Sequence, residues 1–326
     1  MNSMLAAIVS SLGNVECNEI SALKPEFGKV LVKTELASIC GSDLHIAYKG
    51  WNATTFPLDA GHPGHEGIGR VVDGGGTNFT AEDVVLTLPN VFTSRGFAGY
   101  QLLSPQHVLK VNEDLPMEHL MMAQQLGTVI YGSKRLPPLC GKNVVILGQG
   151  SAGLFHDFVL RNQGAEKIIA VDPISKRLEI GQSLGADFGI DVVGKLANEL
   201  IMDITDGLGV DVVVDAVGSV DTLNQAITIA RDQGVVVGFG LPETSDRIPF
   251  NWDTFFRKRL TMYAIHGSQN EVGLPDFKQA LDYIINGNIN VEPFLTHRFP
   301  VDNVQKAFDL ADSREEGVIK ISLTFW

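Results

Sequence analysis

Three glycines between an apolar strand and a helix constrain the fold of this chain more than any other feature. The stretch "VVILGQGSAGLFHDFVL" places Gly148, Gly150 and Gly153 directly after the apolar run 143–147 and at the start of a helical pattern. In that context the first glycine permits a tight turn, the second lets a pyrophosphate approach the backbone, and the third lets the helix pack against the strand. The sequence therefore predicts a dinucleotide-binding turn.

The chain around this turn alternates apolar strands with helical segments. The runs "NVVIL", "KIIAV", "VDVVVDAV" and "GVVVGFG" are each followed by a turn or a helix-length stretch. Near-continuous apolar strands separated by helices are typical of a parallel sheet that is covered on both faces. Residues 141–270 are therefore predicted to form a doubly wound dinucleotide-binding domain.

Asp172 follows the second of these strands, about 20 residues beyond the glycine turn, where an acid accepts hydrogen bonds from the adenosine ribose. Its carboxylate would repel a 2′-phosphate, which favours NAD over NADP, although Lys176 and Arg177 follow closely. The alternative for Asp172 is a helix N-cap before Pro173, and the two roles are compatible. His156 is expected to be a packing residue. The predicted cofactor-binding residues are Gly148, Gly150, Ser151, Ala152, Gly153, Asp172, Arg177 and Val217.

The two ends of the chain are predicted to form a second, β-rich domain. Residues 1–140 contain short alternating runs such as "KVLVKTELAS", separated by Gly, Pro and Asn, which is the pattern of antiparallel strands. Residues 271–326 are too few to fold alone and are expected to pack onto that domain. A length of 326 residues suits two domains.

Charge and cysteine usage exclude several classes of protein. The net charge of −13 disfavours binding to nucleic acid or to anionic membranes, and the basic run 255–260 is expected to be a solvated helix end. No apolar run approaches the roughly 20 residues that span a bilayer. Three widely spaced cysteines do not suit a disulfide framework, so the expected location is the cytoplasm.

"CGSDLH" at 40–45 and "GHEG" at 64–67 bring metal-binding residue types into one short span. A catalytic zinc needs three protein ligands of N, S or O type, and Cys40, His65 and Glu66 would supply one of each. Taken singly, a cysteine is more often a small buried hydrophobe and a histidine more often structural. Together, and beside a dinucleotide domain, the three favour a zinc site.

These motifs, with "GFAGYQLL", "LEIGQSLGAD", "ALDYIINGNI" and "HRFPVDNVQKAFDLA", resemble the zinc-dependent medium-chain alcohol dehydrogenases over essentially the full chain. The resemblance is greatest to the polyol, sugar and threonine dehydrogenase branch. It implies a GroES-like β-rich catalytic domain and a Rossmann domain. It also implies hydride transfer between NAD and a secondary alcohol, polyol or sugar hydroxyl, and a homo-oligomer, either dimer or tetramer.

The resemblance also assigns roles around the zinc. Ser42 and His45 correspond to the proton relay, and Asp43 is expected to hydrogen-bond the imidazole of His65. Gln124, in "QQL", stands where the branch often has a glutamate, so it is the candidate fourth residue on the metal. His62 is expected to be structural. The residues Trp51, Phe92 and Thr93 are candidate walls of the substrate site or, equally, loop packing.

The chain departs from many members of that family in one respect. Residues 67–139 contain no cysteine, so the lobe that carries a structural zinc is predicted to be absent, leaving one zinc per chain. Two other functions stay open from the sequence. One is a zinc-free quinone or enoyl reductase of the same superfamily, and the other is a nucleotide-binding protein without enzymatic activity.

Overall fold

The computed structural model describes residues 3–53, 55–113 and 115–325. The chain forms two compact units, one made of Met1–Gly127 and Gly267–Trp326 and the other of Thr128–His266. The first division falls inside helix α3 (Ala123–Ser133). The boundaries predicted from the sequence, after residues 140 and 270, lie further along the chain. Among the described residues, no helix is long and apolar enough to cross a bilayer.

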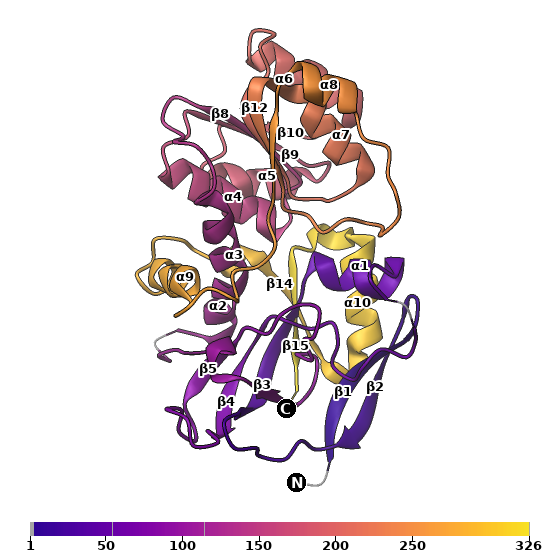
Figure 1. The fold of residues 1–326 in the computed structure, drawn as a ribbon, viewed down its shortest axis with the longest axis vertical. Coiled ribbons are helices and arrows are strands. Elements are labelled where there is room, and N and C mark those ends of the chain that lie inside the picture. Colours follow the sequence, from indigo (N-terminus) through magenta and orange to yellow (C-terminus); the bar gives the residue numbers. More distant parts are fainter. Residues whose placement is uncertain (1–2, 54, 114, 326) are drawn as a thin grey trace. The chain divides into compact units, whose positions relative to one another are not determined.

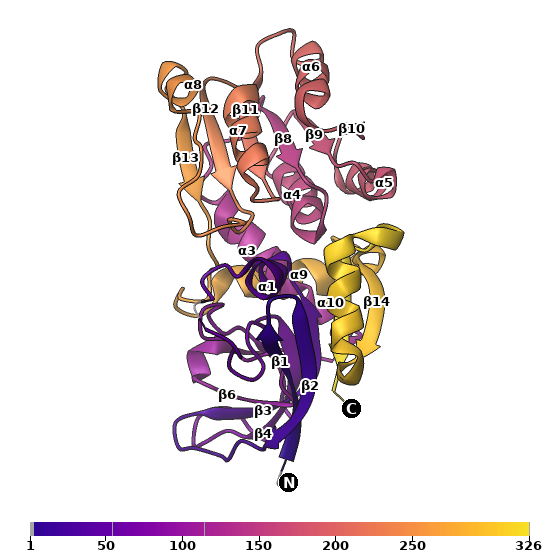
Figure 2. The ribbon, with the colours of Figure 1, turned by 90° about the vertical axis from the view of Figure 1, so that its right-hand side faces the viewer.

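The second unit contains a six-stranded sheet in which every neighbouring pair of strands is parallel. The strand order is β10-β9-β8-β11-β12-β13 (Figure 2). From β8 the chain adds β9 and β10 on one side, and it then adds β11, β12 and β13 on the other side. The glycine turn after β8 therefore lies at the point where the direction of strand addition reverses. The strands are β8 (Asn143–Leu147), β9 (Lys167–Val171), β10 (Phe188–Ile190), β11 (Val210–Asp215), β12 (Ala230–Gly238) and β13 (Thr261–Ala264).

Helices cover both faces of this sheet because successive strand residues point to opposite sides. Val145 and Leu147 of β8 belong to an apolar cluster with residues of α6, α7 and α8. Val144 and Ile146 belong to a second cluster with residues of α4 and α5. The helices are α4 (Ser151–Asn162), α5 (Ser175–Leu184), α6 (Gly194–Ile204), α7 (Val220–Ile229) and α8 (Trp252–Arg257). The predicted doubly wound parallel-sheet domain is confirmed.

The first unit is built mainly from antiparallel strands, as predicted. Its large sheet has the order β14-β15-β3-β4-β5-β7, with β6 also paired to β3. β1 and β2, which Figure 1 shows side by side, form a separate antiparallel pair. Only β14 and β15 pair in parallel among these described strands. The strands are β1 (Ser3–Ser11), β2 (Asn14–Ser21), β3 (Val30–Ile39), β4 (Gly67–Asp73), β5 (Val84–Thr87), β6 (Tyr100–Leu103), β7 (Val108–Lys110), β14 (Leu295–Pro300) and β15 (Lys320–Thr324).

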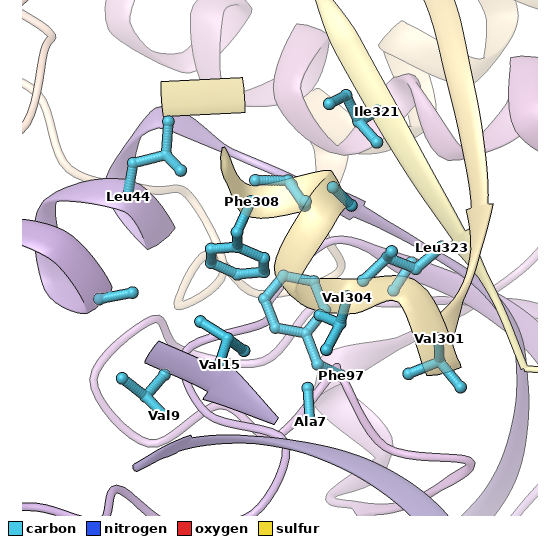
Figure 3. Close-up of a cluster of buried hydrophobic side chains, with 14 of the residues drawn as sticks. Ala7, Val9, Val15, Leu44, Phe97, Val301, Val304, Phe308, Ile321 and Leu323 are labelled. Atoms are coloured by element: carbon cyan, nitrogen blue, oxygen red, sulfur yellow. The ribbon is translucent and has the colours of Figure 1, made fainter. Parts of the chain in front are cut away.

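The two ends of the chain share one apolar core in this unit. Figure 3 shows Phe308 of α10 beside Phe97, and their rings meet edge to face with centroids 5.6 Å apart. Val9 of β1 and Leu323 of β15 belong to the same buried cluster. The helices are α1 (Gly41–Lys49), α2 (Met117–Met121), α9 (Pro275–Ile285) and α10 (Val304–Ser313), and single 3-10 turns lie at Pro105–His107, Glu292–Phe294, Val301–Asn303 and Glu315–Gly317.

Strand pairing in this sheet decides where the polar motifs meet. β3 lies between β15 and β4, with Ile321 opposite Ile39 and Gly67 opposite Ala37. The last residues of β3, the first residue of β4 and the first residue of β15 therefore lie at the same end of the sheet. Residues just outside these strands, near 40, 66 and 320, are brought together by the pairing.

Candidate functional site

Cys40, His65 and Glu66 form a cluster whose ligand atoms all lie within 4.8 Å of one another. His65 and Glu66 are buried and Cys40 is half-buried. A thiolate sulfur, an imidazole nitrogen and a carboxylate oxygen from two separate segments are a donor set that suits Zn²⁺. The residues therefore fit a zinc ion.

Asp43 joins the two segments that carry this cluster. Cys40 is the N-cap of α1, and its backbone N–H donates to Asp43 Oδ2 at 2.8 Å. The other oxygen, Asp43 Oδ1, lies 3.1 Å from His65 Nδ1. A fully buried carboxylate at N3 of the helix thus fixes both the backbone of one candidate ligand and the ring of the other.

The ring of His65 is oriented by the groups at its two nitrogens. Nδ1 faces Asp43 and the carbonyl oxygen of Pro63, which is 3.2 Å away, and Nε2 lies 3.4 Å from Ser42 Oγ. A proton on Nδ1 leaves Nε2 with a lone pair for a metal. Burial alone would lower the pKa of His65, but the Asp43 carboxylate and Cys40 together outweigh burial and raise that pKa well above its ordinary value.

Glu66 is held by a lysine that the sequence analysis missed. Lys320 Nζ donates to Glu66 Oε2 at 2.7 Å, and Ser38 Oγ donates to the same oxygen. Burial would raise the pKa of Glu66, but the Lys320 ammonium and the His65 ring hold it below its usual value, so the carboxylate is charged. The signal in the sequence was a lysine inside the apolar run "GVIKISLTF".

The residue found next to Cys40 from helix α3 is Gln125. Its Nε2 lies 3.9 Å from Cys40 Sγ, within the range of a weak N–H···S contact, and its Oε1 is buried without a partner in the described structure. Gln124, the predicted fourth residue on the metal, is also buried in α3. Both glutamines belong to the motif "QQL", of which only Gln124 was predicted to lie at the metal.

The other candidate residues lie on α1 and in loops of the same unit. Ser42 and His45 lie three residues apart on α1 and are both half-buried, so they share one face of the helix. Trp51 and Phe92 stack with ring centroids 5.8 Å apart. His62 Nδ1 lies 3.0 Å from the carbonyl oxygen of Ser94, a contact with the backbone of a neighbouring loop.

The glycine turn has the backbone that its sequence predicts. Gly148 has φ +90°, and a Cβ there would stand 2.6 Å from Val217 Cγ2, while a Cβ on Gly153 would stand 1.9 Å from the carbonyl oxygen of Gly148. Around Gly150 there is open space. The α4 N-cap, Gly150, makes no side-chain capping bond, so the backbone N–H groups near Ser151 and Ala152 are available to an anion.

Asp172 is fixed to the same turn. Its Oδ2 accepts the backbone N–H of Gln149 at 2.7 Å, and its Oδ1 accepts the N–H of Ile174 at 2.9 Å. Arg177 Nη1 lies 3.6 Å from Oδ2. The alternative role as a helix N-cap is not found, because α5 begins at Ser175 and its N-cap is Ile174. His156 is buried, its Nδ1 donates to the Ala152 carbonyl oxygen at 2.8 Å, and its ring packs on Phe239.

A Rossmann unit with a phosphate-binding turn and a β-rich unit with a Cys–His–Glu cluster define a class of protein, the metal-dependent dehydrogenases that use a nicotinamide cofactor. Two family models match the chain. The alcohol dehydrogenase GroES-like domain matches residues 26–112, and the zinc-binding dehydrogenase domain matches residues 153–286.

Relatives match along almost the full chain. The chain is 30% identical to an L-threonine 3-dehydrogenase of Pyrococcus furiosus, covering 94% of this chain and 95% of that protein. It is 25% identical to an erythritol/L-threitol dehydrogenase of Mycolicibacterium smegmatis, covering 98% and 97%. The fold of an Escherichia coli alcohol dehydrogenase solved with NADH superposes with a TM-score of 0.83, at 22% identity and covering both chains fully (100% each).

The chain belongs to the zinc-type medium-chain alcohol dehydrogenase family. It is an oxidoreductase of that family, whose members use a zinc ion and a nicotinamide cofactor. The resemblance inferred from the motifs is thereby confirmed, and the zinc-free reductase and the non-enzymatic protein are not favoured.

Proposed function

We propose that this protein transfers hydride between NAD and the carbinol carbon of a secondary alcohol, polyol or sugar, with one zinc ion per chain. The observation that carries the proposal is the meeting of Cys40, His65 and Glu66 within 4.8 Å in a chain of this family. The names of relatives that act on threonine and on erythritol or L-threitol support a substrate with a hydroxyl group on a short, polar carbon chain.

Cys40 and His65 would hold the metal, and Glu66 and Gln124 are the further candidates. The zinc would supply Lewis-acid polarisation of the substrate hydroxyl, and the nicotinamide would accept the hydride. Glu66 Oε2 already accepts a hydrogen bond from Lys320. While this ion pair is intact, Glu66 would contribute negative charge beside the metal, and it would become a ligand only if the ion pair opened. Gln125 would donate to the Cys40 thiolate and so moderate its negative charge.

The residues of α1 would carry the proton that the hydroxyl loses. Ser42 Oγ would accept it and pass its own proton towards the His45 ring, which shares its helix face and is half-buried. Because an imidazole titrates near neutral pH, His45 would exchange that proton with solvent.

The function is tested by metal analysis and an absorbance screen. Purified protein should contain about one zinc per chain, and it should form NADH with some members of a panel of secondary alcohols, polyols, aldoses and hydroxy amino acids. A chelator should abolish this activity and added zinc should restore it. Turnover that is insensitive to chelation would support the zinc-free reductase, and two zinc ions per chain would contradict the predicted absence of the structural-zinc lobe.

Asp172 is the proposed source of the preference for NAD. Asp172→Asn removes the charge and keeps one of the two oxygens that accept backbone N–H groups, so it is the most conservative change that tests the carboxylate. We expect the ratio of NAD to NADP affinity to fall roughly tenfold, since one interaction between charges near a protein surface is worth about 1–4 kcal/mol.

Cofactor affinities measured by fluorescence titration test this proposal. Asp203→Asn, which removes the same charge from an exposed position on α6, should leave the ratio unchanged. An unaltered ratio in Asp172→Asn would remove Asp172 from cofactor selection.

We infer a homo-oligomer in the cytoplasm as the working form, on the family resemblance and on the cysteine usage described above. Dimer and tetramer are equally compatible with it. Light scattering of the purified protein distinguishes them.

A further inference from the structure

Gln149 and Asp157 form a buried polar pair directly beneath the glycine turn. Both side chains have no exposed surface. All four of their polar side-chain atoms, Gln149 Oε1 and Nε2 and Asp157 Oδ1 and Oδ2, lack a hydrogen-bond partner in the described structure. Native proteins rarely leave buried polar groups without partners, so four in one place require an explanation.

The two side chains approach each other at Gly181 of α5. A Cβ on Gly181 would stand 2.3 Å from Gln149 Oε1 and 2.9 Å from Asp157 Oδ2. Two oxygens therefore share the space that a side chain at residue 181 would fill. They repel each other if both are acceptors, and they attract if one of them carries a proton.

A protonated carboxyl group and a primary amide have complementary hydrogen-bonding atoms. The carboxyl O–H donates to the amide oxygen, and the amide N–H donates to the carboxyl C=O. A ring of these two hydrogen bonds would give a partner to both oxygens of Asp157 and to both the oxygen and the nitrogen of the Gln149 amide. An ionised carboxylate could only accept, and it would leave Gln149 Oε1 unpaired beside a buried negative charge.

The charged groups on the neighbouring elements are either paired with other residues or at least partly exposed to solvent. On α5, Arg177 lies against Asp172 after β9. On α4 itself, Arg161 donates to the Gly185 carbonyl and to Asp187. Three further groups lie on the packed elements: Lys176 and Glu179 are exposed, and Lys167 of β9 is half-buried. Burial raises the pKa of Asp157 well above its ordinary value, and the Gln149 amide beside it offsets only part of that rise.

We propose that Asp157 keeps its proton in the folded protein and, by pairing with Gln149, is a positioning residue for the cofactor-binding turn. Gln149 stands between Gly148 and Gly150, and its backbone N–H donates to Asp172 at 2.7 Å. A bond from Asp157 that holds the Gln149 side chain would therefore also hold the backbone of the turn, which binds the pyrophosphate, and Asp172, which binds the ribose. This inference rests on the proposed use of that turn by a nicotinamide cofactor.

The proposal predicts how stability changes with pH. An aspartate in the unfolded chain ionises near pH 3.9. Between that pH and the higher pKa of folded Asp157, the folded protein holds one more proton than the unfolded chain. Its unfolding constant therefore rises by up to tenfold for each pH unit, until the folded-state proton leaves.

Urea unfolding of the full-length protein between pH 5 and pH 9 tests whether the unfolding constant rises with pH in this way. Asp157→Asn keeps a complementary amide–amide pair without a titrating group, so its stability relative to the wild type should increase as the pH rises. The matched control is Asp211→Asn in the same unit, which breaks the ion pairs of Asp211 with Lys142 and Arg231 and should lower stability. Parallel pH profiles for wild type and Asp157→Asn would overturn the proposal.

Infrared spectroscopy and cofactor binding give two further readouts. The wild type should show the C=O stretch of a protonated carboxyl group, and Asp157→Asn should lack it; the same spectrum for both proteins would overturn the assignment. Asp157→Leu and Gly181→Ala should weaken NADH binding about tenfold, whereas Asp157→Asn at pH 6 should not. A wild type that binds no NADH would contradict the proposed function, while the infrared and unfolding results would still decide the state of Asp157.

Discussion

Cys40→Ala is expected to remove both the bound zinc and the dehydrogenase activity. Cys40 is the one thiol within ligand distance of His65 and Glu66 in the described structure, and the cluster has no second sulfur that could replace it. Loss of a Lewis acid worth several kcal/mol should lower kcat/KM roughly a thousandfold or more. Zinc content per chain and the initial rate of NADH formation on the best alcohol substrate measure the two effects.

Cys17→Ala is the matched control for this variant. Cys17 lies in β2 of the same unit, outside the cluster, with its Sγ 3.5 Å from Asp302 Oδ1. Burial, reinforced by Asp302, raises the pKa of this thiol to about 11, so it is protonated and a poor metal ligand at neutral pH. Its replacement should leave zinc content and rate unchanged. Normal zinc content in Cys40→Ala would rule out the proposed ligand set.

Lys320→Met is expected to cost more stability than any surface substitution. Lys320 is 1% exposed and its ammonium group pairs with the equally buried Glu66. Removing one member of a buried ion pair leaves the other charge without compensation, which destabilises a protein by about 3–5 kcal/mol. The measurement is the free energy of urea unfolding in chelator-treated protein, because a bound zinc ion would partly neutralise the uncompensated charge of buried Glu66.

Two further variants separate the ion pair from loss of packing. Lys320→Met with Glu66→Gln removes both charges and should recover much of the stability. Lys195→Met breaks the exposed pair of Lys195 with Glu199, whose atoms are 3.7 Å apart, and should change stability by less than about 1 kcal/mol. A double variant no more stable than Lys320→Met alone would show that the lysine acts through packing.

Much of the candidate cofactor site could be predicted, because the sequence features that mark it lie close together along the chain. Gly148 and Gly153 are required by a positive φ and by a close backbone approach, and both conditions arise within one strand–turn–helix unit. Asp172 comes directly after the next strand, β9. The sequence did not reveal that both oxygens of Asp172 already accept backbone N–H groups, since this depends on how the turn folds back on the acid.

Around the candidate zinc site, only the residues within the two short motifs could be predicted. "CGSDLH" and "GHEG" gave Cys40, His65, Glu66 and the partner Asp43, because residue type and short spacing carry that information. Lys320 is 254 positions away from Glu66, and only the pairing of β15 with β3 and of β3 with β4 brings them together.

The sequence by itself therefore determined the strand and helix pattern, the phosphate-binding turn and the candidate zinc donors, all of which are written in short-range spacing and polarity. The tertiary structure decided which of these polar groups are buried, and what pairs with each one. Lys320 with Glu66 and Gln125 with Cys40 are set in this way. The physical reason is that burial removes water as a partner, and the replacement partner is chosen by packing between segments that are distant along the chain.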